Sequence, residues 1–572
     1  MNKTIRQFLL PLFISSTLLA AGDGKWRSEL YPENGNKPEA ANLDTDKVLQ
    51  DFSYAGYHSG EAAIPDVKGP VFDVTAAPYS ADPTGAIDAT TAIQSAINAA
   101  GKAGGGVVFL PAGTFRLSVP SEKNEALLID KPKVVLRGAG SEHTFLLNTT
   151  YSLMRYKTII RVRNPGDGDL WQAGSFQTPL SRDLLNSTTK IPVSDARRFK
   201  PSDTVIVRND ITEEWIREHK ETAWEGHAGA RTLRGLVYRR TVKKVDISAG
   251  ILTVSAPIRY SLKLRDKARV VLLASAPLSE VGLEDFSVGN IQHPGTRWQE
   301  GDSPVKGMPG YEITDAWFIT VERAEDCWVR RVSSFQPEGN TSTAHLLSCG
   351  IRIRESTRVT VENCSLRRPQ YGGGGGNGYL YQLFDAAECL IQRSEARYAR
   401  HGFQITGMGA SGNVIHDCLD AETGRATGAT GYYKTGGAGS DHHAHFSQAN
   451  LIDVCTAEDS RFEVRYRPYG SVPQHRLAGV HSVFWNTRGM TGEKGQKWAA
   501  VVLSEQARYG YIIGTRGECT RVILKHDFPA GTDPIDYLEG EGKGDTLEPF
   551  SLFQDQRLRR LGSVAVRNSK TK

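Results

Sequence analysis

A short pattern recurs along the second half of the chain: an apolar residue, two mostly polar residues, then a small or apolar residue. From Val329 onward, successive copies begin 24 to 37 residues apart. A coil of three short strands and three turns needs about 20 to 30 residues, so longer intervals indicate loops inserted at one turn. The repeat therefore predicts an all-β protein, a single-stranded right-handed parallel β-helix. The copies begin at Leu283, Val329, Val361, Ile391, Ile415, Ile452 and Val480.

All seven cysteines lie beyond residue 326, and several occupy the same position of the repeat. An odd number leaves at least one of them unpaired. The absence of any C-x-x-C motif gives no support to a zinc ribbon or a thioredoxin-like site. We therefore expect stacked, buried thiols inside the coils rather than a disulfide framework.

An amphipathic helix is expected before the coils. Residues 88–101 carry apolar side chains at helical spacing, with Asp88 placed to cap the first turn and Gly101 to end the last. Because the open end of a solenoid exposes core and strand edges, this helix is predicted to be the N-terminal cap.

Five stretches of the N-terminal third stand out around this helix: Phe72-Asp-Val-Thr75, Asp82-Pro-Thr-Gly85, Asp88 to Ala100, Gly104 to Phe115 and Val134 to Gly140. Together they resemble the opening of the pectate lyase-like superfamily, in the branch with a rhamnogalacturonase and epimerase-type N-terminal pectate lyase domain. The resemblance covers residues 70–147 strongly and the coils to about residue 525 more loosely. It implies an extracellular, carbohydrate-active right-handed β-helix. It leaves the reaction open, because this scaffold hosts lyases, hydrolases, epimerases and non-catalytic binding proteins.

Residues 1–21 have the features of a secretory signal peptide, with Lys3 and Arg6 before an apolar run and small residues at its end. The protein is therefore expected to be exported, to the periplasm or beyond the cell. No later run reaches 18 apolar residues, so no membrane span is predicted. The composition, 39% apolar and 23% charged with a net charge of +5, excludes a disordered chain and demands no nucleic-acid partner. It leaves the oligomeric state open.

The segment between Asn148 and Leu283 breaks the coil rhythm with short β elements, which predicts a small inserted β subdomain. The expected organisation is a signal peptide (1–21), an N-terminal extension packing on the solenoid (22–69), the cap and first coils (70–147), first-half coils with the inserted subdomain (148–280), coils carrying the site (281–525) and a C-terminal extension (526–572).

Histidines gather in the C-terminal coils, where seven of the fourteen lie between positions 401 and 481. His416 and His481 occupy the second position of the repeat, so we expect them to be structural. In enzymes of the resembled superfamily, residues that follow the repeat strand line the substrate groove. The longest insertion, residues 430–445, is expected to border the same groove. Counting past the repeat anchors reaches Arg368, Tyr371, Tyr398, Arg400 and His401.

We predict six catalytic and eight substrate-binding residues. The catalytic residues are Arg400, His401, Tyr433, Lys434, His443 and His445, and the substrate-binding residues are Arg368, Tyr371, Tyr379, Tyr398, His442, Arg465, Arg467 and Trp485. Three of these histidines lie close to Asp441 in sequence and offer metal ligands, but no further carboxylate pattern fixes a geometry, so the metal is left unknown. The sequence shows no required cofactor, and calcium stays open.

These side chains suit β-elimination on an acidic, uronate-containing polysaccharide. The reaction needs a group that neutralises the carboxylate, a base for the C5 proton and an acid for the leaving oxygen. The expected roles are carboxylate binding by Arg400 and His443, proton abstraction by Lys434 or His445, and protonation of the leaving oxygen by Tyr433 or His401.

Two alternatives stay open, a glycoside hydrolase on the same scaffold and a β-helix that binds polysaccharide without cleaving it. The motifs of polygalacturonase-type hydrolases, which carry paired carboxylates, are not intact in the sequence, and this disfavours hydrolysis. An enzyme is favoured over a binding protein if the predicted residues share one concavity.

Overall fold

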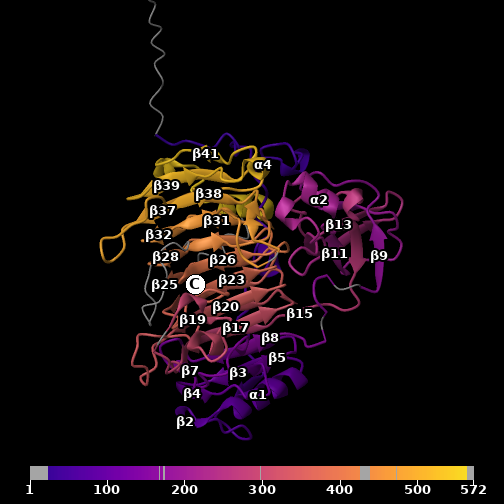
Figure 1. Cartoon of the computed structure of the whole chain (residues 1–572). Coiled ribbons are helices and arrows are strands. Elements are labelled where there is room, and N and C mark those ends of the chain that lie inside the picture. The colour runs from indigo at the N-terminus through magenta and orange to yellow at the C-terminus, as the bar shows by residue number, and fades with distance from the viewer. Residues whose placement is uncertain are drawn as a thin grey trace, which may run out of the picture.

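The computed structural model describes residues 24–166, 168–171, 174–296, 298–424, 439–471 and 473–562. Two long parallel sheets wind into a stack of coils, which Figure 1 shows running from α1 (Thr90–Lys102) to β41 (Tyr537–Glu539), with a separate lobe on one side. The predicted parallel β-helix is therefore confirmed. Within the described residues, no helix is long and apolar enough to cross a membrane.

The repeat anchors lie above one another in the larger sheet. Leu283 pairs with Val329, and the column continues one coil at a time as far as Ile452. The last predicted anchor, Val480, was wrong. The partner of Ile452 is Phe484, because Val480 belongs to a short strand on another side of the coil and pairs with Gln448. The strands of the column are β16 (Gly282–Asn290), β19 (Trp328–Ser334), β21 (Thr360–Glu362), β24 (Leu390–Gln392), β27 (Val414–His416), β31 (Leu451–Asp453) and β37 (Val483–Met490).

A second sheet of ten parallel strands forms another side of the solenoid. Its inward side chains, such as Ile351, Tyr381 and Phe403, belong to the main hydrophobic core, and polar side chains alternate with them on the outward face. The strands are β5 (Glu125–Ile129), β8 (Thr158–Val162), β17 (Trp317–Glu322), β20 (Cys349–Arg354), β23 (Tyr379–Phe384), β26 (His401–Thr406), β29 (Ser440–His442), β33 (Phe462–Val464), β38 (Val502–Ser504) and β40 (Val522–Leu524).

Helix α1 covers the N-terminal end of the core, as predicted, with Ile93 and Ile97 buried. Its ends differ slightly from the expectation. The N-cap position is Ala89, while the carboxylate of Asp88 accepts a hydrogen bond from the backbone N–H of Thr90, and the helix runs one residue past Gly101.

The lobe is the predicted inserted subdomain, an antiparallel six-stranded sheet with its own core. Trp215 and Trp224 belong to that core together with Phe446 and Leu477 of the solenoid, so the lobe is packed against the coils. Its elements are β9 (Phe176–Pro179), β10 (Lys190–Pro192), β11 (Thr204–Arg208), α2 (Glu213–Glu218), β12 (Val237–Asp246), β13 (Ile251–Val254) and β14 (Arg269–Leu272).

All seven cysteines are unpaired, as expected from the repeat; six are buried and Cys519 is half-buried. Along the flank of the solenoid, Tyr31, Leu49 and Phe52 pack with α5 (Leu552–Leu561) over the outward side of the larger sheet. That face is therefore covered, and the outward face of the ten-stranded sheet is left for a ligand.

Candidate active site

Four side chains meet on the outward face of the ten-stranded sheet: His401, Asp441, His443 and Arg467, hereafter the histidine cluster. The Oδ2 atom of Asp441 lies 2.9 Å from Nδ1 of His443 and 2.6 Å from a terminal nitrogen of Arg467, and Oδ1 lies 3.4 Å from Nδ1 of His401. Asp441 is fully buried, whereas the side chain of His443 is 16% exposed. A ligand would therefore reach the cluster at His443.

The register of the coils explains why these residues meet. Gln404, Asp441 and Glu463 are direct partners on successive strands β26, β29 and β33. Because alternate residues of a strand point the same way, Glu463 and Arg465 share the outward side with Asp441. Arg467 pairs with Glu463 on its own coil at 3.0 Å and with Asp441 on the preceding coil at 2.6 Å, which ties the two coils together.

Positive charge exceeds negative charge around the cluster. Glu463 is held by Arg461 at 2.6 Å and Arg465 at 2.7 Å as well as by Arg467. With Arg400 nearby, four guanidinium groups face the two carboxylates of Asp441 and Glu463. Such a surplus favours an anionic ligand.

The hydrogen bonds indicate which imidazole nitrogens are free. Nδ1 of His401 lies 3.1 Å from the backbone oxygen of Gly439, which can only accept, so this nitrogen carries the proton. Asp441 likewise accepts from Nδ1 of His443. A terminal nitrogen of Arg467 also lies 2.9 Å from that Nδ1, but it has the backbone oxygen of His443 as another acceptor at 3.3 Å. Both imidazoles therefore present an unprotonated Nε2.

Burial fixes the protonation states. It lowers the pKa of His401 to about 3 and that of His443 to about 4, so both imidazoles are neutral near pH 7. Burial raises the pKa of Asp441, but the Nδ1–H groups of His401 and His443 and the guanidinium of Arg467 together hold it well below its ordinary value. The cluster thus combines an ionised carboxylate with two neutral bases.

A tyrosine lies beside the free nitrogen of His443. The hydroxyl of Tyr379 is 3.5 Å from Nε2 of His443, and its ring centre is 5.0 Å from that of His401. Burial raises the pKa of Tyr379 to about 12, so it keeps its proton. The guanidinium of Arg400 lies 5.9 Å from the centre of the same ring and donates to the backbone oxygen of Gly373. A proton acceptor, a proton donor and a cation are therefore adjacent.

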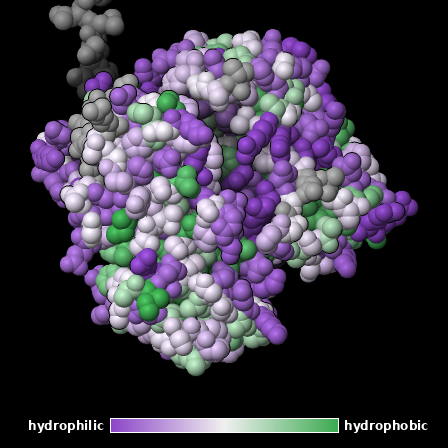
Figure 2. Space-filling model, turned by 60° about the horizontal axis from the view of Figure 1, so that its bottom comes forward, coloured by the Kyte–Doolittle hydropathy of each residue, from purple (hydrophilic) through white to green (hydrophobic). Residues whose placement is uncertain are grey.

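The loop that carries His475, supported from behind by the inserted subdomain, forms a second wall. The ring of His475 lies 5.2 Å from that of His443 and 5.7 Å from that of His445. Trp224 of the lobe lies 6.4 Å from His445 and donates from its indole nitrogen to the backbone oxygen of Gln474. Figure 2 shows a hollow between solenoid and lobe with hydrophilic residues around it.

A divalent cation is a poor match for the cluster. His401, Asp441 and His443 offer donor atoms within 4.8 Å of one another, which is the spacing of a metal site. However, the guanidinium of Arg467 already lies between Asp441 and His443 and contacts the ligand atoms of both. A cation there would be repelled by this permanent charge, so the geometry fits acid–base chemistry better.

The structure separates the predicted residues into groups. It brings His401, His443, Tyr379, Arg400, Arg465 and Arg467 together, with His445 at the edge. Tyr433 and Lys434 lie outside the described residues, as do residues 1–21 with the predicted export signal.

Three predicted substrate-binding residues were wrong because their side chains face protein. His442 points into the coil interior, 6.2 Å from the ring of Phe484. Trp485 is buried under Tyr31 on the flank covered by the N-terminal extension. Tyr371 is fully buried, and its hydroxyl donates to the backbone oxygens of residues 299 and 300. His442 follows the outward-facing Asp441 on β29, and adjacent residues of a strand point to opposite faces, whereas Tyr371 and Trp485 are covered by other segments of the chain.

Arg368 and Tyr398 form a separate pair. The guanidinium stacks 3.9 Å from the centre of the tyrosine ring, and the hydroxyl of Tyr398 donates to Glu493 at 2.6 Å. These contacts link them to one another and to Glu493, not to the histidine cluster.

Sequence reasoning missed two members of the site, Glu463 and His475, and gave Asp441 only a metal-binding role. One signal was present for Glu463: charged residues alternate with others at positions 461, 463, 465 and 467, which places them on one face of a strand. His475 gave no such signal, because it reaches the cluster from a loop.

Comparison with known proteins gives a partial match at the N-terminal end. The family described as rhamnogalacturonase A/epimerase, pectate lyase-like, matches residues 74–197. Alginate lyase 7 of Azotobacter vinelandii is 46% identical over 68 residues, 12% of this chain and 8% of that protein. Mannuronan C5-epimerase AlgE6 of the same organism is 36% identical over 107 residues, 19% of this chain and 12% of that protein. The matches thus span only about a tenth of these relatives.

Among solved structures, the tailspike gp61 of Pseudomonas phage phi297 is similar with a TM-score of 0.47 and 12% identity. The alignment covers 79% of this chain and 71% of the tailspike.

Proposed function

Because the chain belongs to the pectate lyase-like superfamily of parallel β-helices, we propose that it is an exported enzyme that acts on an acidic, uronate-containing polysaccharide by β-elimination. One observation carries the proposal: two neutral imidazoles, an ionised carboxylate, a tyrosine and several arginines converge on one outward face. The alginate lyase and mannuronan epimerase matches support an acidic glycan as substrate.

In the proposed mechanism, His443 is the base and Tyr379 the acid. These roles differ from those expected from the sequence, which placed His443 on the carboxylate, because a neutral His443 suits proton abstraction better than charge neutralisation. Nε2 of His443 takes the C5 proton, the electron pair forms the C4–C5 double bond, and the C4–oxygen bond breaks. Tyr379 gives its proton to the departing oxygen. Arg400 and Arg465, both partly exposed, are placed to bind the carboxylate of the sugar and stabilise the negative charge that develops.

Asp441 and Arg467 are positioning residues in this scheme. Asp441 holds the proton of His443 on Nδ1, which keeps Nε2 free for the substrate. Arg467 in turn bridges Asp441 and Glu463. Since the acceptor on His443 and the donor on Tyr379 are 3.5 Å apart, proton removal and leaving-group protonation would occur on the same face of the sugar.

Hydrolysis is the weaker alternative. A hydrolase needs one protonated and one ionised carboxyl group at the bond to be cleaved. Asp441 and Glu463 are neighbours on successive coils, and both pair with Arg467. The pKa of Asp441 is held well below its ordinary value, so this carboxylate is not suited to donate a proton.

The first test is a substrate panel. Purified protein is incubated with alginate, pectic and glycosaminoglycan polymers, each with and without a chelator or added calcium. We expect ultraviolet absorbance from a 4,5-unsaturated chain end with one class of polymer, in the presence of chelator as well. New reducing ends without that absorbance would show that the polymer is cleaved by hydrolysis and not by elimination. A change in uronate configuration without cleavage would indicate epimerisation.

The buried histidines also predict a stability change with pH. In the unfolded chain, histidine has a pKa of about 6.5, so below that pH the unfolded state binds more protons and stability falls as the pH decreases toward 4. Glu221, Asp385, Asp420 and Asp536, whose pKa values burial raises to about 7, 7, 6 and 7, oppose this because they bind protons in the folded state. Burial lowers the pKa to about 3 or 4 in eight histidines, which outnumber them: His219, His345, His401, His442, His443, His445, His475 and His481.

We therefore expect the thermal unfolding midpoint to decrease steadily between pH 6.5 and pH 4. Calorimetry at closely spaced pH values measures it. A midpoint that stays level or rises over this window would contradict the assignment of neutral buried imidazoles.

A further inference from the structure

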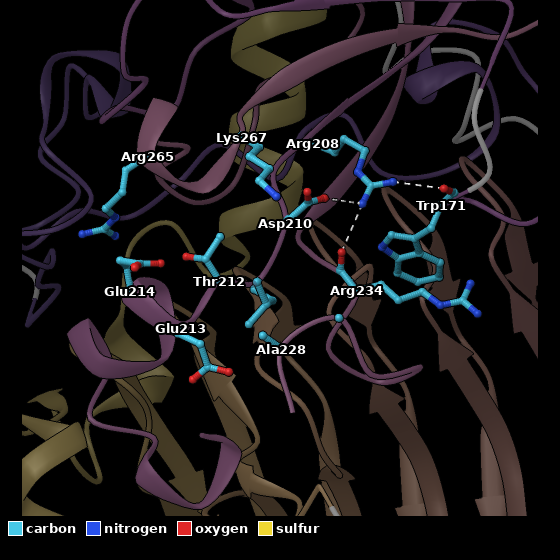
Figure 3. A pocket seen from close by; sticks show the side chains of 12 residues that line it. Trp171, Arg208, Asp210, Thr212, Glu213, Glu214, Ala228, Arg234, Arg265 and Lys267 are labelled. Atoms are coloured by element: carbon cyan, nitrogen blue, oxygen red, sulfur yellow. Dashed lines mark hydrogen bonds and ion pairs between the residues drawn. The ribbon is translucent and has the colours of Figure 1, made fainter. Parts of the chain in front are cut away.

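A cavity of about 660 Å³ opens in the inserted subdomain, and none of its lining residues belongs to the histidine cluster. It lies between Trp171, the end of β11, the start of α2 and the loop before β14, and we call it the lobe pocket (Figure 3). Its volume is within the range of about 300 to 1,000 Å³ typical of small-ligand sites. The proposed mechanism makes no use of it.

One side of the lobe pocket combines an aromatic ring with a cation. The guanidinium of Arg234 lies 5.6 Å from the ring centre of Trp171, and Figure 3 shows both side chains on the same side of the cavity. Arg208 fixes this wall. Its buried guanidinium donates to the backbone oxygens of Trp171 and Arg234, both at 3.1 Å, and to Asp210 at 2.8 Å. The wall is therefore preformed.

An unpaired positive charge lies next to this wall. Asp210 is already bound by Arg208 and Arg269, each at 2.8 Å. The exposed ammonium of Lys267 forms no ion pair with any residue in the described part of the chain, although it lines the same cavity. A ligand that carries one carboxylate would form an ion pair with Lys267.

The opposite side of the cavity carries Glu213 and Glu214, as Figure 3 shows. One oxygen of Glu213 accepts from the backbone N–H of Gly226 at 3.0 Å, which leaves the other carboxylate oxygen for a ligand hydroxyl. With Asp210, three carboxylates line the pocket, so it suits a sugar unit that brings one carboxylate to Lys267 better than a multiply charged group such as a phosphate. A stacking ring, one spare cation and hydroxyl acceptors together describe a singly charged sugar.

The aromatic side is tied to the segment that joins the lobe to the solenoid. Arg234 pairs with Asp169 at 2.5 Å, and Asp169 lies between β8 of the ten-stranded sheet and β9 of the lobe.

We propose that the lobe pocket is an accessory subsite that binds one uronate unit of an acidic glycan, with its carboxylate on Lys267, its ring on Trp171 and its hydroxyls on Glu213 and Glu214. The inference rests on the proposed function only for the class of glycan. It adds that the inserted subdomain holds the chain away from the point of cleavage.

Binding is measured calorimetrically on the full chain carrying His443→Ala, in which turnover is expected to be slowed by at least about a hundredfold. The probes are hexamers of mannuronate, guluronate and galacturonate, and the same hexamers after reduction of their carboxyl groups. We expect Lys267→Glu and Trp171→Ala each to weaken binding of one acidic hexamer by about tenfold. Lys243→Glu makes the same charge change at an exposed position of the same subdomain and is expected to leave binding unchanged.

Equal affinities for the Lys267→Glu and Lys243→Glu proteins would overturn the subsite, as would equal binding of reduced hexamers or no binding of any hexamer. If binding depends on Lys267 but no polymer is cleaved, the subsite proposal stands and the proposed lyase activity is wrong. If a polymer is cleaved but binding does not depend on Lys267, the lyase activity stands and the subsite proposal is wrong.

Discussion

Replacing His443 by alanine is expected to lower kcat on the responsive polymer by about 10²- to 10⁴-fold, the usual contribution of a positioned general base. His443 is the most exposed member of the histidine cluster and presents a free Nε2. Initial rates of unsaturated-end formation measure the effect. Added imidazole should restore part of the activity, because a small base can occupy the space left by the side chain.

Two further variants test whether the loss of activity is due to the role of His443 as the base. Asp441→Asn keeps the shape of the cluster but no longer holds the proton on Nδ1 of His443, so its loss should appear mainly in kcat and should not respond to imidazole. His143→Ala removes an exposed histidine at the N-terminal end of the solenoid and should leave the rate unchanged. A His443→Ala protein with normal kcat would remove His443 from the role of base.

The second large effect concerns stability. Glu388 is 1% exposed and binds two buried arginines of the inserted subdomain, Arg240 at 2.9 Å and Arg259 at 2.6 Å. Replacing it by alanine leaves two guanidinium groups buried without their carboxylate. Breaking a buried ion pair in this way costs about 3 to 5 kcal/mol, so we expect the free energy of unfolding to decrease by that amount.

Urea unfolding followed by tryptophan fluorescence is a suitable measurement, because Trp215 and Trp224 lie in the core of the subdomain. Replacing all three residues by apolar residues of similar size should recover most of the lost stability. Glu214→Gln, which removes an exposed ion pair with Arg217, is the matched control and should change little. If Glu388→Ala behaved like this control, the triad would not anchor the lobe.

Part of the histidine cluster could be predicted from the sequence. Clustering in sequence pointed to His401 and His443, and Arg465 and Arg467 were also predicted as substrate-binding residues, whereas the alternation of charges that includes Glu463 was not used. Clustering did not distinguish His442 from His443, although one faces the core and the other the ligand. That distinction depends on which residue of β29 continues the outward column of Gln404, and this register is set by packing of the neighbouring coil.

The sequence alone determined the solenoid and the unpaired state of the cysteines, because both follow from the repeat of the coils. It also determined the capping helix, from its helical spacing of apolar residues, and the inserted subdomain, from the interruption of the repeat. Tertiary structure decided the rest. The contact of Asp441 with Arg467, the placement of His475 beside His443 and the covering of Trp485 by Tyr31 join residues from different coils, loops and termini. No repeat encodes them, since they depend on how separately folded segments pack against one another in space.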